Sequence, residues 1–289
     1  MNGNLSLRSL LNHSALATSE AKILMAYILE KHYQLPRSAL LSRDNMQLHP
    51  EAMENWQNLE SRRLAGEPIA YLVGKRGFHN IELYVAPGVL IPRPETELLV
   101  EIGLREIKRI RNSTTVLDLG TGSGAIALAI AHDAPQAIVT ATDQSPEALD
   151  IAKINAQQLK MVSRVRFIQG SWYEPLDAHA SFDIILSNPP YIAAQDAHLS
   201  QGDLRFEPFS ALTDQGNGLS CIEIIISGAL GHLNSNGLIA IEHGFDQSDA
   251  VVTLLKLAGF HDIQTHQDFA GHYRVASGKK IDGNNLFPH

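Results

Sequence analysis

Apolar residues in the first part of the chain recur at three- and four-residue spacing, the pattern of one buried face on an α-helix. They are Leu5, Leu7, Leu10, Leu11, Ala21, Leu24, Met25, Ile28 and Leu29. Ser19 predicts a capped start for the second helix, Pro36 separates it from a short third one, and a fourth is expected from Pro50 to near Gly66. We predict a helical bundle over residues 1–66, which either only stabilises the fold or docks a macromolecular substrate.

The hydrophobic pattern changes after residue 66. Two short apolar runs, at residues 69–73 and 81–85, are separated by a stretch that contains Gly74 and Asn80. Short apolar runs bounded by turn-forming residues predict strands. We therefore expect a β-hairpin linker over residues 67–90.

From residue 114 onward, apolar runs typical of buried strands alternate with longer stretches of helical periodicity. This alternation predicts an α/β fold with a mainly parallel sheet. The last two strands are separated only by a short turn, so they can pair antiparallel at the sheet edge. We expect this domain to span residues 91–278, before a flexible polar tail over 279–289. The expected strands are 115–120, 137–143, 165–170, 182–187, 237–243, 262–269 and 272–277, and the expected helices are 123–133, 145–159, 217–233 and 246–258.

Composition narrows the class of protein. The 289 residues are 44% hydrophobic and 19% charged, as in ordinary globular domains. A net charge of −8 argues against broad nucleic-acid binding. The single cysteine, Cys221, suits a reducing compartment, and we expect a cytoplasmic protein with no membrane segment, since no apolar run is long enough to span a bilayer. The 13 histidines show no zinc-ligand spacing, so no metal is expected.

A glycine-rich turn follows the first strand of the α/β region. It reads Gly120-Thr121-Gly122-Ser123-Gly124 and opens a helix, so a ligand can approach the backbone N–H groups at the helix start. The spacing differs from the Gly-x-Gly-x-x-Gly of pyrophosphate sites, and a bare glycine motif is shared with dinucleotide-binding folds. Asp118, in the same motif, is expected to order the loop or to contact an amino group of the ligand.

Two further residues stand where a nucleoside ligand would lie. Asp143 ends the second strand, where a carboxylate can accept both hydroxyls of a ribose. Its alternative role is the N-cap of the helix that begins at Ser145-Pro146. Trp172 follows the third strand and could lie flat on an adenine, or belong to the core.

The strongest motif is Asn188-Pro189-Pro190-Tyr191, directly after the apolar strand at 182–187. Two prolines end the strand and stiffen the loop that carries Asn188. The Asn188 carboxamide oxygen and the Pro189 carbonyl are two acceptors for the two hydrogens of a planar –NH2 group, and Tyr191 offers an aromatic face. The alternative is a strand-ending turn without chemistry.

The run Leu90-Ile91-Pro92-Arg93-Pro94-Glu95-Thr96-Glu97 lies ahead of the glycine motif. Two prolines that bracket an arginine make a rigid turn, and Glu95 or Thr96 can cap the helix that follows. The density of Pro, Arg and Glu favours a loop shaped to meet a ligand over a simple solvated helix start.

Together, the glycine motif, Asp143 and Asn188–Tyr191 resemble class I S-adenosylmethionine-dependent methyltransferases that act on amino groups. The run 90–97, Gly77-Phe78 and Arg205-Phe206-Glu207-Pro208 narrow the resemblance to the release factor glutamine methyltransferases, the PrmC/HemK family, over about residues 5–278. This resemblance implies a Rossmann-like methyltransferase domain, with a seven-stranded mixed sheet whose last strand is antiparallel, joined by the hairpin to the helical bundle.

The resemblance also implies the reaction and the site. A methyl group passes from S-adenosyl-L-methionine to the side-chain amide (N5) of the glutamine in the Gly-Gly-Gln motif of peptide chain release factors. Cofactor contacts are implied for Gly120, Thr121, Gly122, Ser123, Gly124, Asp143, Trp172 and Asn188, and glutamine contacts for Asn188, Pro189, Pro190 and Tyr191. Many family members carry an acid at the position of Ser171, which leaves the adenine contact there open. We expect a monomer that binds release factors and no nucleic acid or membrane.

Catalysis would then rest on Asn188, Pro189 and Tyr191, without a general base. Three other functions compete. A DNA adenine or rRNA guanine amino-methyltransferase shares the Asn-Pro-Pro-aromatic motif but needs a basic groove. A nicotinamide-dependent oxidoreductase explains the glycines and Asp143 but not Asn188–Tyr191. A catalytically silent binding module would not need an intact site.

Overall fold

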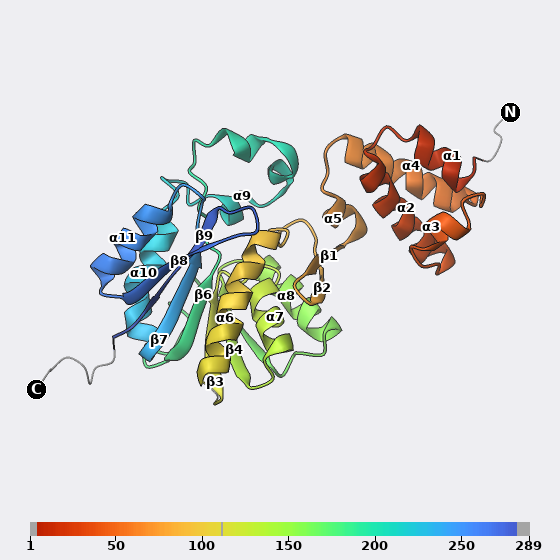
Figure 1. Cartoon of the computed structure of the whole chain (residues 1–289). Coiled ribbons are helices and arrows are strands. Elements are labelled where there is room, and N and C mark those ends of the chain that lie inside the picture. The colour runs from red at the N-terminus through yellow and green to blue at the C-terminus, as the bar shows by residue number, and fades with distance from the viewer. Residues whose placement is uncertain (1–4, 111, 282–289) are drawn as a thin grey trace, which may run out of the picture. The chain divides into compact units, whose positions relative to one another are not determined.

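The computed structural model describes residues 5–110 and 112–281 (Figure 1). The chain divides into two compact units, Met1–Lys75 and Arg76–His289, and each is described by itself. The boundary falls inside the region expected to link the domains, and the bounds 1–66, 67–90 and 91–278 stay predictions. Most of the expected tail, residues 282–289, lies outside the described residues.

The first unit is helical. Its core consists of apolar side chains at the predicted spacing, with Leu24, Met25, Ile28 and Leu29 fully buried. The Ser19 cap is wrong, because the second helix begins at Thr18, so that Ser19 lies inside it, and its N-cap, Ala17, makes no side-chain hydrogen bond. The helices are α1 (Leu7–His13), α2 (Thr18–Tyr33), α3 (Ala39–Ser42), α4 (Pro50–Leu64) and α5 (Ile69–Val73).

The strand expected at residues 69–73 is also wrong, since this run forms α5. Pro68 stands at its N-terminus and Gly74 closes it with a left-handed φ of 71°. A short apolar run does not distinguish a strand from a buried helix. Packing against α2 and α4 decides for the helix here. The hairpin instead consists of β1 (Lys75–Phe78) and β2 (Ile81–Tyr84).

The second unit is the seven-stranded sheet, in the order β5-β4-β3-β6-β7-β9-β8. Strands β3 to β7 pair in parallel, and β9 is antiparallel to both β7 and β8, which confirms the predicted fold class. The strands are β3 (Thr114–Leu119), β4 (Ala137–Asp143), β5 (Val165–Gln169), β6 (Phe182–Ser187), β7 (Leu233–Glu242), β8 (His261–Gln267) and β9 (Tyr273–Lys279).

Helices cover both faces of this sheet (Figure 1). Because both faces are buried, its central strands are nearly all apolar. The longer helices are α6 (Glu97–Ile110), α7 (Ala125–Asp133), α8 (Pro146–Gln158), α10 (Ser220–His232) and α11 (Ser248–Ala258). The shorter ones are η1 (Pro94–Thr96), η2 (Ala197–Ser200), η3 (Gly202–Phe206) and α9 (Phe209–Leu212). Among the described residues, no helix combines the length and the apolar character that crossing a bilayer requires.

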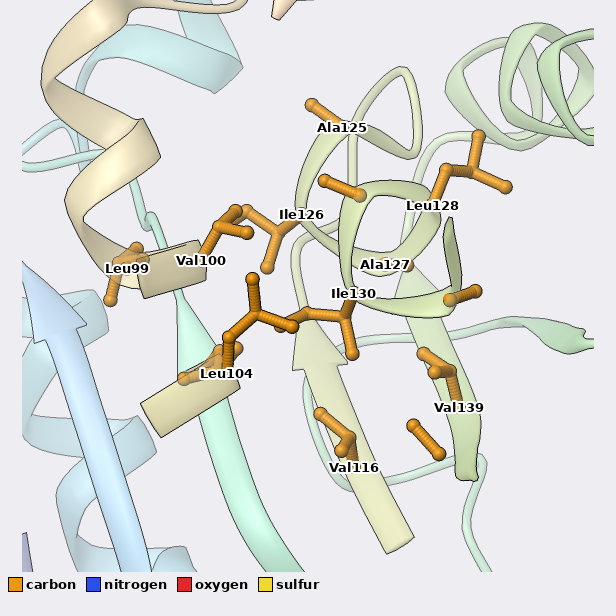
Figure 2. Close-up of a cluster of buried hydrophobic side chains, with 14 of the residues drawn as sticks. Leu99, Val100, Leu104, Val116, Ala125, Ile126, Ala127, Leu128, Ile130 and Val139 are labelled. Atoms are coloured by element: carbon orange, nitrogen blue, oxygen red, sulfur yellow. The ribbon is translucent and has the colours of Figure 1, made fainter. Parts of the chain in front are cut away.

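Alternate residues of each central strand enter two separate cores. Figure 2 shows the core under α6 and α7, where Leu104 and Ile130 meet Val116 of β3. The next residue, Leu117, belongs to the other core, with Ile222 of α10 and other apolar residues. This two-sided burial fixes the register of the strands and hence the positions of the loops at their carboxyl ends.

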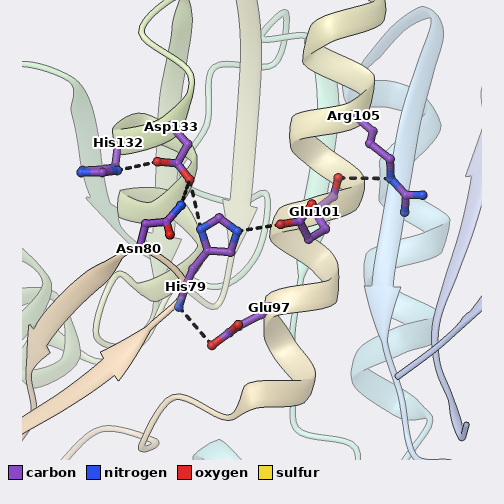
Figure 3. A network of polar contacts seen from close by, with 7 residues as sticks. All are labelled: His79, Asn80, Glu97, Glu101, Arg105, His132 and Asp133. Atoms are coloured by element: carbon purple, nitrogen blue, oxygen red, sulfur yellow. Dashed lines mark hydrogen bonds and ion pairs between the residues drawn. The ribbon is translucent and has the colours of Figure 1, made fainter. Parts of the chain in front are cut away.

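Within the second unit, polar side chains attach the turn of the hairpin to α6 and α7 (Figure 3). His79, at a φ of 50°, places Nε2 2.8 Å from Glu101 of α6 and Nδ1 3.1 Å from Asp133 of α7. The backbone N–H of His79 donates to Glu97, and Asn80 donates to Asp133 at 2.7 Å. We call His79, Asn80, Glu97, Glu101 and Asp133 the hairpin cluster.

Candidate active site

A cavity of about 330 Å³ lies at the carboxyl ends of the parallel strands, the usual position of ligand sites in open α/β sheets. The loops after β3, β4, β5 and β6 contribute to its wall, together with residues 88–96 and 208–211. The lining residues that the sequence predicted are Gly120, Thr121, Gly122, Ser123, Asp143, Ser171, Trp172, Asn188 and Pro190. Gly124, Pro189 and Tyr191 do not line it.

Asp118 stabilises the glycine-rich turn through hydrogen bonds. This carboxyl is fully buried, accepts a hydrogen bond from the Thr121 hydroxyl at 2.6 Å and another from the Ala127 N–H at 3.1 Å. Burial raises the pKa of Asp118 to about 7. Asp118 is not a lining residue of the cavity, so the structure supports the role of ordering the loop among its two predicted roles.

Gly124 acts in the turn through packing. It is the N-cap of α7 with a φ of 84°, and a Cβ there would lie 2.9 Å from Leu128 and 3.3 Å from Ala152. A side chain at this position would strain the backbone and displace the core. Gly124 thus shapes the turn that the other glycines present to the cavity.

Asp143 lies at the end of β4 and lines the cavity. Its Oδ2 accepts a hydrogen bond from the Gly122 N–H at 2.8 Å and its Oδ1 one from the Ser145 N–H at 2.9 Å. Burial raises the pKa of this carboxyl, and these backbone hydrogen bonds oppose the shift. The N-cap of α8 is Ser145, whose hydroxyl accepts from the Ala148 N–H, so the alternative role of Asp143 as the cap is wrong. The carboxylate keeps lone pairs for a ligand.

Trp172 packs against the core and also lines the cavity, and its contact with an adenine stays a prediction. The indole is half-buried against the core of the α10 and α11 face, yet it lines the cavity. A Cβ on Gly120 would lie 3.2 Å from the indole Cζ3, so the glycine leaves room for the ring against the turn. The ring thereby forms one wall of the cavity.

Asn188 is oriented by a residue far away in the sequence. Its Nδ2 donates to the hydroxyl oxygen of Thr96 at 3.0 Å, and no described residue donates to its Oδ1. The carboxamide therefore has its donor end engaged and its acceptor end open. The predicted capping role of Glu95 or Thr96 is wrong, because the chain enters α6 through the 3-10 turn η1, whose N-cap residue is Arg93, without a side-chain cap hydrogen bond, and Thr96 is buried inside that entry.

Tyr191 faces a second hollow, of about 540 Å³, which Arg93, Glu242 and Arg274 also line. Its hydroxyl donates to Oε1 of the buried Glu242 at 3.1 Å. Asn188 and Pro190 thus face one cavity and Tyr191 another. The stiff loop that carries them stands between the two.

The runs at residues 90–97 and 205–208 contact each other, which the sequence did not predict. Glu207 is buried, accepts from the Ile91 N–H at 3.0 Å and forms an ion pair with Arg93. This contact joins the segment after β6 to the loop before α6. Glu242 was not predicted at all. Its only signal is a carboxylate directly after the apolar run of β7, at the same sheet edge as Asn188.

The described residues contain no group of three or more His, Cys, Asp or Glu side chains that could hold a metal ion.

Comparison with known proteins bears on both units. Residues 7–74 match the PrmC N-terminal domain and residues 95–217 the methyltransferase small domain. In solved structures, the fold resembles the 16S rRNA N2 G1207 methyltransferase of T. thermophilus, in complex with AdoMet and guanosine. The TM-score is 0.53 and the identity 19%, over 71% of this chain and 49% of that one, which shows the fold alone.

Two curated relatives match over nearly their whole length, and both are named release factor glutamine methyltransferase. The protein of Bordetella pertussis is 48% identical over 94% of this chain and 98% of its own. That of Burkholderia pseudomallei is 46% identical over 93% of this chain and 94% of its own. Identity of this extent, across both units, shows that the chain belongs to the release factor glutamine methyltransferase family.

Proposed function

We propose that this protein transfers a methyl group from S-adenosyl-L-methionine to the side-chain amide nitrogen of the glutamine in the Gly-Gly-Gln motif of peptide chain release factors. The observation that carries the proposal is the orientation of Asn188. Its Nδ2 is bound to Thr96, so its Oδ1 is the free end of the carboxamide at the wall of the cavity. An acceptor in that place suits a substrate group that has only hydrogens to donate.

The residues of the first cavity fit the methyl donor. Asp143 has lone pairs left to accept ribose hydroxyls, Trp172 offers a flat apolar wall for adenine, and the turn at Gly120–Gly122 allows close approach to the backbone. The cavity volume of about 330 Å³ is within the range of small-molecule sites. When bound, S-adenosyl-L-methionine supplies a methyl group activated by a sulfonium. Ser171 also lines the cavity, and its hydroxyl could accept a hydrogen bond from the adenine amino group.

The chain itself supplies position and charge. The nitrogen of a glutamine amide is a poor nucleophile, because its lone pair is delocalised onto the carbonyl. Oδ1 of Asn188 and the carbonyl of Pro189 would accept its two N–H bonds and hold the nitrogen toward the cavity. The same two dipoles stabilise positive charge that develops on the nitrogen, and Tyr191 supports the amide plane from the side of the second hollow. The surplus proton leaves to water afterwards, so no general base is needed.

Mass spectrometry tests the proposal directly. A release factor is incubated with the protein and labelled S-adenosyl-L-methionine, and its Gly-Gly-Gln peptide is analysed. We expect a mass gain of one labelled methyl group on the glutamine. A release factor in which this glutamine is replaced by glutamate is the matched control and should stay unlabelled. A glutamine that remains unmodified under saturating donor would refute the assignment.

The partner is proposed to be a protein rather than a nucleic acid. A net charge of −8 does not suit a groove that binds the phosphate backbone. Binding of a release factor should weaken only slightly with added salt, whereas phosphate contacts give a steep slope.

We also propose that the protein acts as a monomer. Analytical ultracentrifugation tests this proposal, and we expect the mass of one copy of the chain alone and of a one-to-one complex with a release factor.

A further inference from the structure

Glu242 is a buried carboxylate beside the proposed active site, and the mechanism above does not use it. It ends β7, and its side chain is fully buried. Strands β6 and β7 run parallel with Ser187 opposite Ile241, so Asn188, which follows β6, and Glu242, the last residue of β7, lie at neighbouring positions of the same sheet edge. A buried carboxylate without partners costs free energy, so the groups that contact Glu242 determine whether it is tolerated there.

The contacts of Glu242 lead to Asn188 by way of Thr96. Oε1 accepts from the Tyr191 hydroxyl at 3.1 Å. Oε2 is buried and has no hydrogen-bond partner among the described residues, and the Thr96 hydroxyl lies close enough to this carboxyl to oppose the rise in its pKa that burial causes. Thr96 in turn accepts from Asn188 Nδ2 at 3.0 Å. We call Asn188, Thr96, Glu242 and Tyr191 the carboxamide cluster.

The direction of these hydrogen bonds depends on the charge of Glu242. An ionised carboxylate only accepts, so a Thr96 hydroxyl that satisfies the unpartnered Oε2 must donate its single hydrogen to it. The oxygen of Thr96 is then left as an acceptor, and only the NH2 end of Asn188 can satisfy it. A neutral side chain at position 242 could donate instead, which would let Thr96 donate to Asn188 and turn the carboxamide round.

We propose that Glu242 is a positioning residue that acts through Thr96 to keep Oδ1 of Asn188, and not Nδ2, toward the amide of the substrate. The inference rests on the proposed function, since it deepens the account of the same site. With the carboxamide reversed, an NH2 group would face the NH2 group of glutamine. Two donors then oppose each other, and the substrate nitrogen loses one of its two acceptors.

Charged groups around Glu242 set the pH at which this arrangement holds. Burial raises its pKa to about 7, the Thr96 and Tyr191 hydroxyls and Arg274 of β9 oppose the shift, and Glu95 adds to it. Besides these, Arg93, His198 and Asp203 line the same hollow, and His243 is the next residue in the chain. The active, ionised form therefore gains population as the pH rises through about 7.

The test is Glu242→Gln, which keeps the shape of the side chain and removes the charge. We expect kcat on a release factor to fall about a hundredfold, the size of effect that loss of orientation produces. The affinity for S-adenosyl-L-methionine, measured by calorimetry, should stay unchanged. The rise of kcat with pH near 7 should be lost. Wild-type kcat and an unchanged pH profile would overturn the inference.

Glu106→Gln is the matched control. Glu106 is a buried carboxylate of α6 that pairs with Lys279 at 2.6 Å and belongs to neither cavity. Its replacement should leave kcat and the pH profile as in the wild type, even where it lowers the melting temperature. If Glu106→Gln lost kcat as Glu242→Gln does, a general loss of stability would explain both, and the inference would fall.

Thr96 provides a second route if Glu242→Gln does not fold. Thr96→Val removes the hydroxyl at constant shape and should lose kcat as Glu242→Gln does, whereas Thr96→Ser keeps the hydroxyl and should retain it. Where the double variant Thr96→Val/Glu242→Gln folds, its kcat should be no lower than that of either single variant, because both changes interrupt the same connection from Glu242 to Asn188. Equal kcat in the Val and Ser variants overturns the inference, while a wild-type protein that methylates no release factor overturns the proposed function itself.

Discussion

The hairpin cluster and the carboxamide cluster are both networks of polar side chains in the second unit, but they differ in what surrounds them. In the hairpin cluster, the side chain of Glu101 is 57% exposed, while those of His79 and Asp133 are 10% and 19% exposed. In the carboxamide cluster, Thr96 and Glu242 are buried. The contacts of the first cluster join its members to one another (Figure 3), whereas the second cluster leaves an acceptor, Oδ1 of Asn188, open at a cavity.

The comparison shows which polar networks point to function. Exposed ion pairs fasten one element to another and add little energy, because water competes for every group. A buried network fixes the orientation of its members, since each donor and acceptor has few alternatives. An unused acceptor at the end of such a network is therefore a stronger sign of a ligand than the number of charged contacts.

The largest expected effect is that of removing the acceptor itself. Asn188→Ala should raise the barrier to methyl transfer by roughly 2.7–4 kcal/mol, by analogy with the loss of one contact to developing charge. Affinity for S-adenosyl-L-methionine should suffer less. Single-turnover rates on a release factor and calorimetry with the cofactor measure the two effects. Asn80→Ala, the same change in the hairpin cluster, is the control and should leave the rate unaltered.

If Asn188→Ala kept near-full turnover, the proposed mechanism would be wrong. If instead Asn80→Ala slowed the reaction as much, the distinction between the two clusters would be lost. Both outcomes can be read from the same assay.

The next effect is the pH dependence of stability. As the pH rises through about 7, ionisation of Glu242 lowers the free energy of unfolding, whereas it raises kcat. The pKa of Glu242 is about 7 in the folded protein, against 4.5 for a free glutamate. Between these pH values the folded state binds a proton that the unfolded state has released, so the stability contributed by this group falls as the pH rises. The difference corresponds to about 3 kcal/mol at most. Asp118, with its pKa also raised to about 7, adds a decline of the same sign.

Chemical denaturation of the wild type and of Glu242→Gln across this pH range measures the contribution. The free energy of unfolding of the variant should decline less with rising pH than that of the wild type, because Asp118 is then the one carboxyl of this pair that still titrates. An identical decline in both proteins would show that Glu242 is ionised throughout. In that case the pH dependence of kcat could not come from this residue.

A smaller effect is expected at Asp143. Asp143→Asn keeps the shape but weakens the acceptor for the ribose hydroxyls, and should lower the affinity for S-adenosyl-L-methionine by roughly 1.5–3 kcal/mol, the range for hydrogen bonds to charged groups. Calorimetry provides the measurement. Asp133→Asn makes the same change in the hairpin cluster and should leave the affinity unchanged. Equal affinities in the two variants would remove Asp143 from the cofactor site.

The sequence predicted the residues that line the first cavity better than the hydrogen bonds that orient them. Strands β4 and β6 begin and end at the predicted residues, because each is an apolar run bounded by turn-forming residues. Since such strands end at one edge of the sheet, the positions of Asp143 and Asn188 followed from local signals. Trp172 followed in the same way.

Contacts between distant residues could not be predicted in this way. Thr96, Asn188 and Glu242 come from three separate elements, and their hydrogen bonds depend on side-chain directions that periodicity does not describe. Residues 69–73 were mistaken for a strand because tertiary packing, and not local pattern, decides such a short run. Errors and omissions thus concentrate where the determining partner is far away in the sequence.

The smallest effect is expected in the hairpin cluster. Glu101→Gln removes an exposed partner of His79 and should change the free energy of unfolding by less than about 1 kcal/mol, because exposed ion pairs contribute little. Asp133 and the Glu97 contact to the His79 N–H would still hold the turn. Urea denaturation provides the value, with Glu106→Gln as the buried counterpart that should cost more. A larger loss for Glu101→Gln than for Glu106→Gln would mean that burial does not separate the two kinds of network, and the comparison would have to rest on the open acceptor of Asn188 alone.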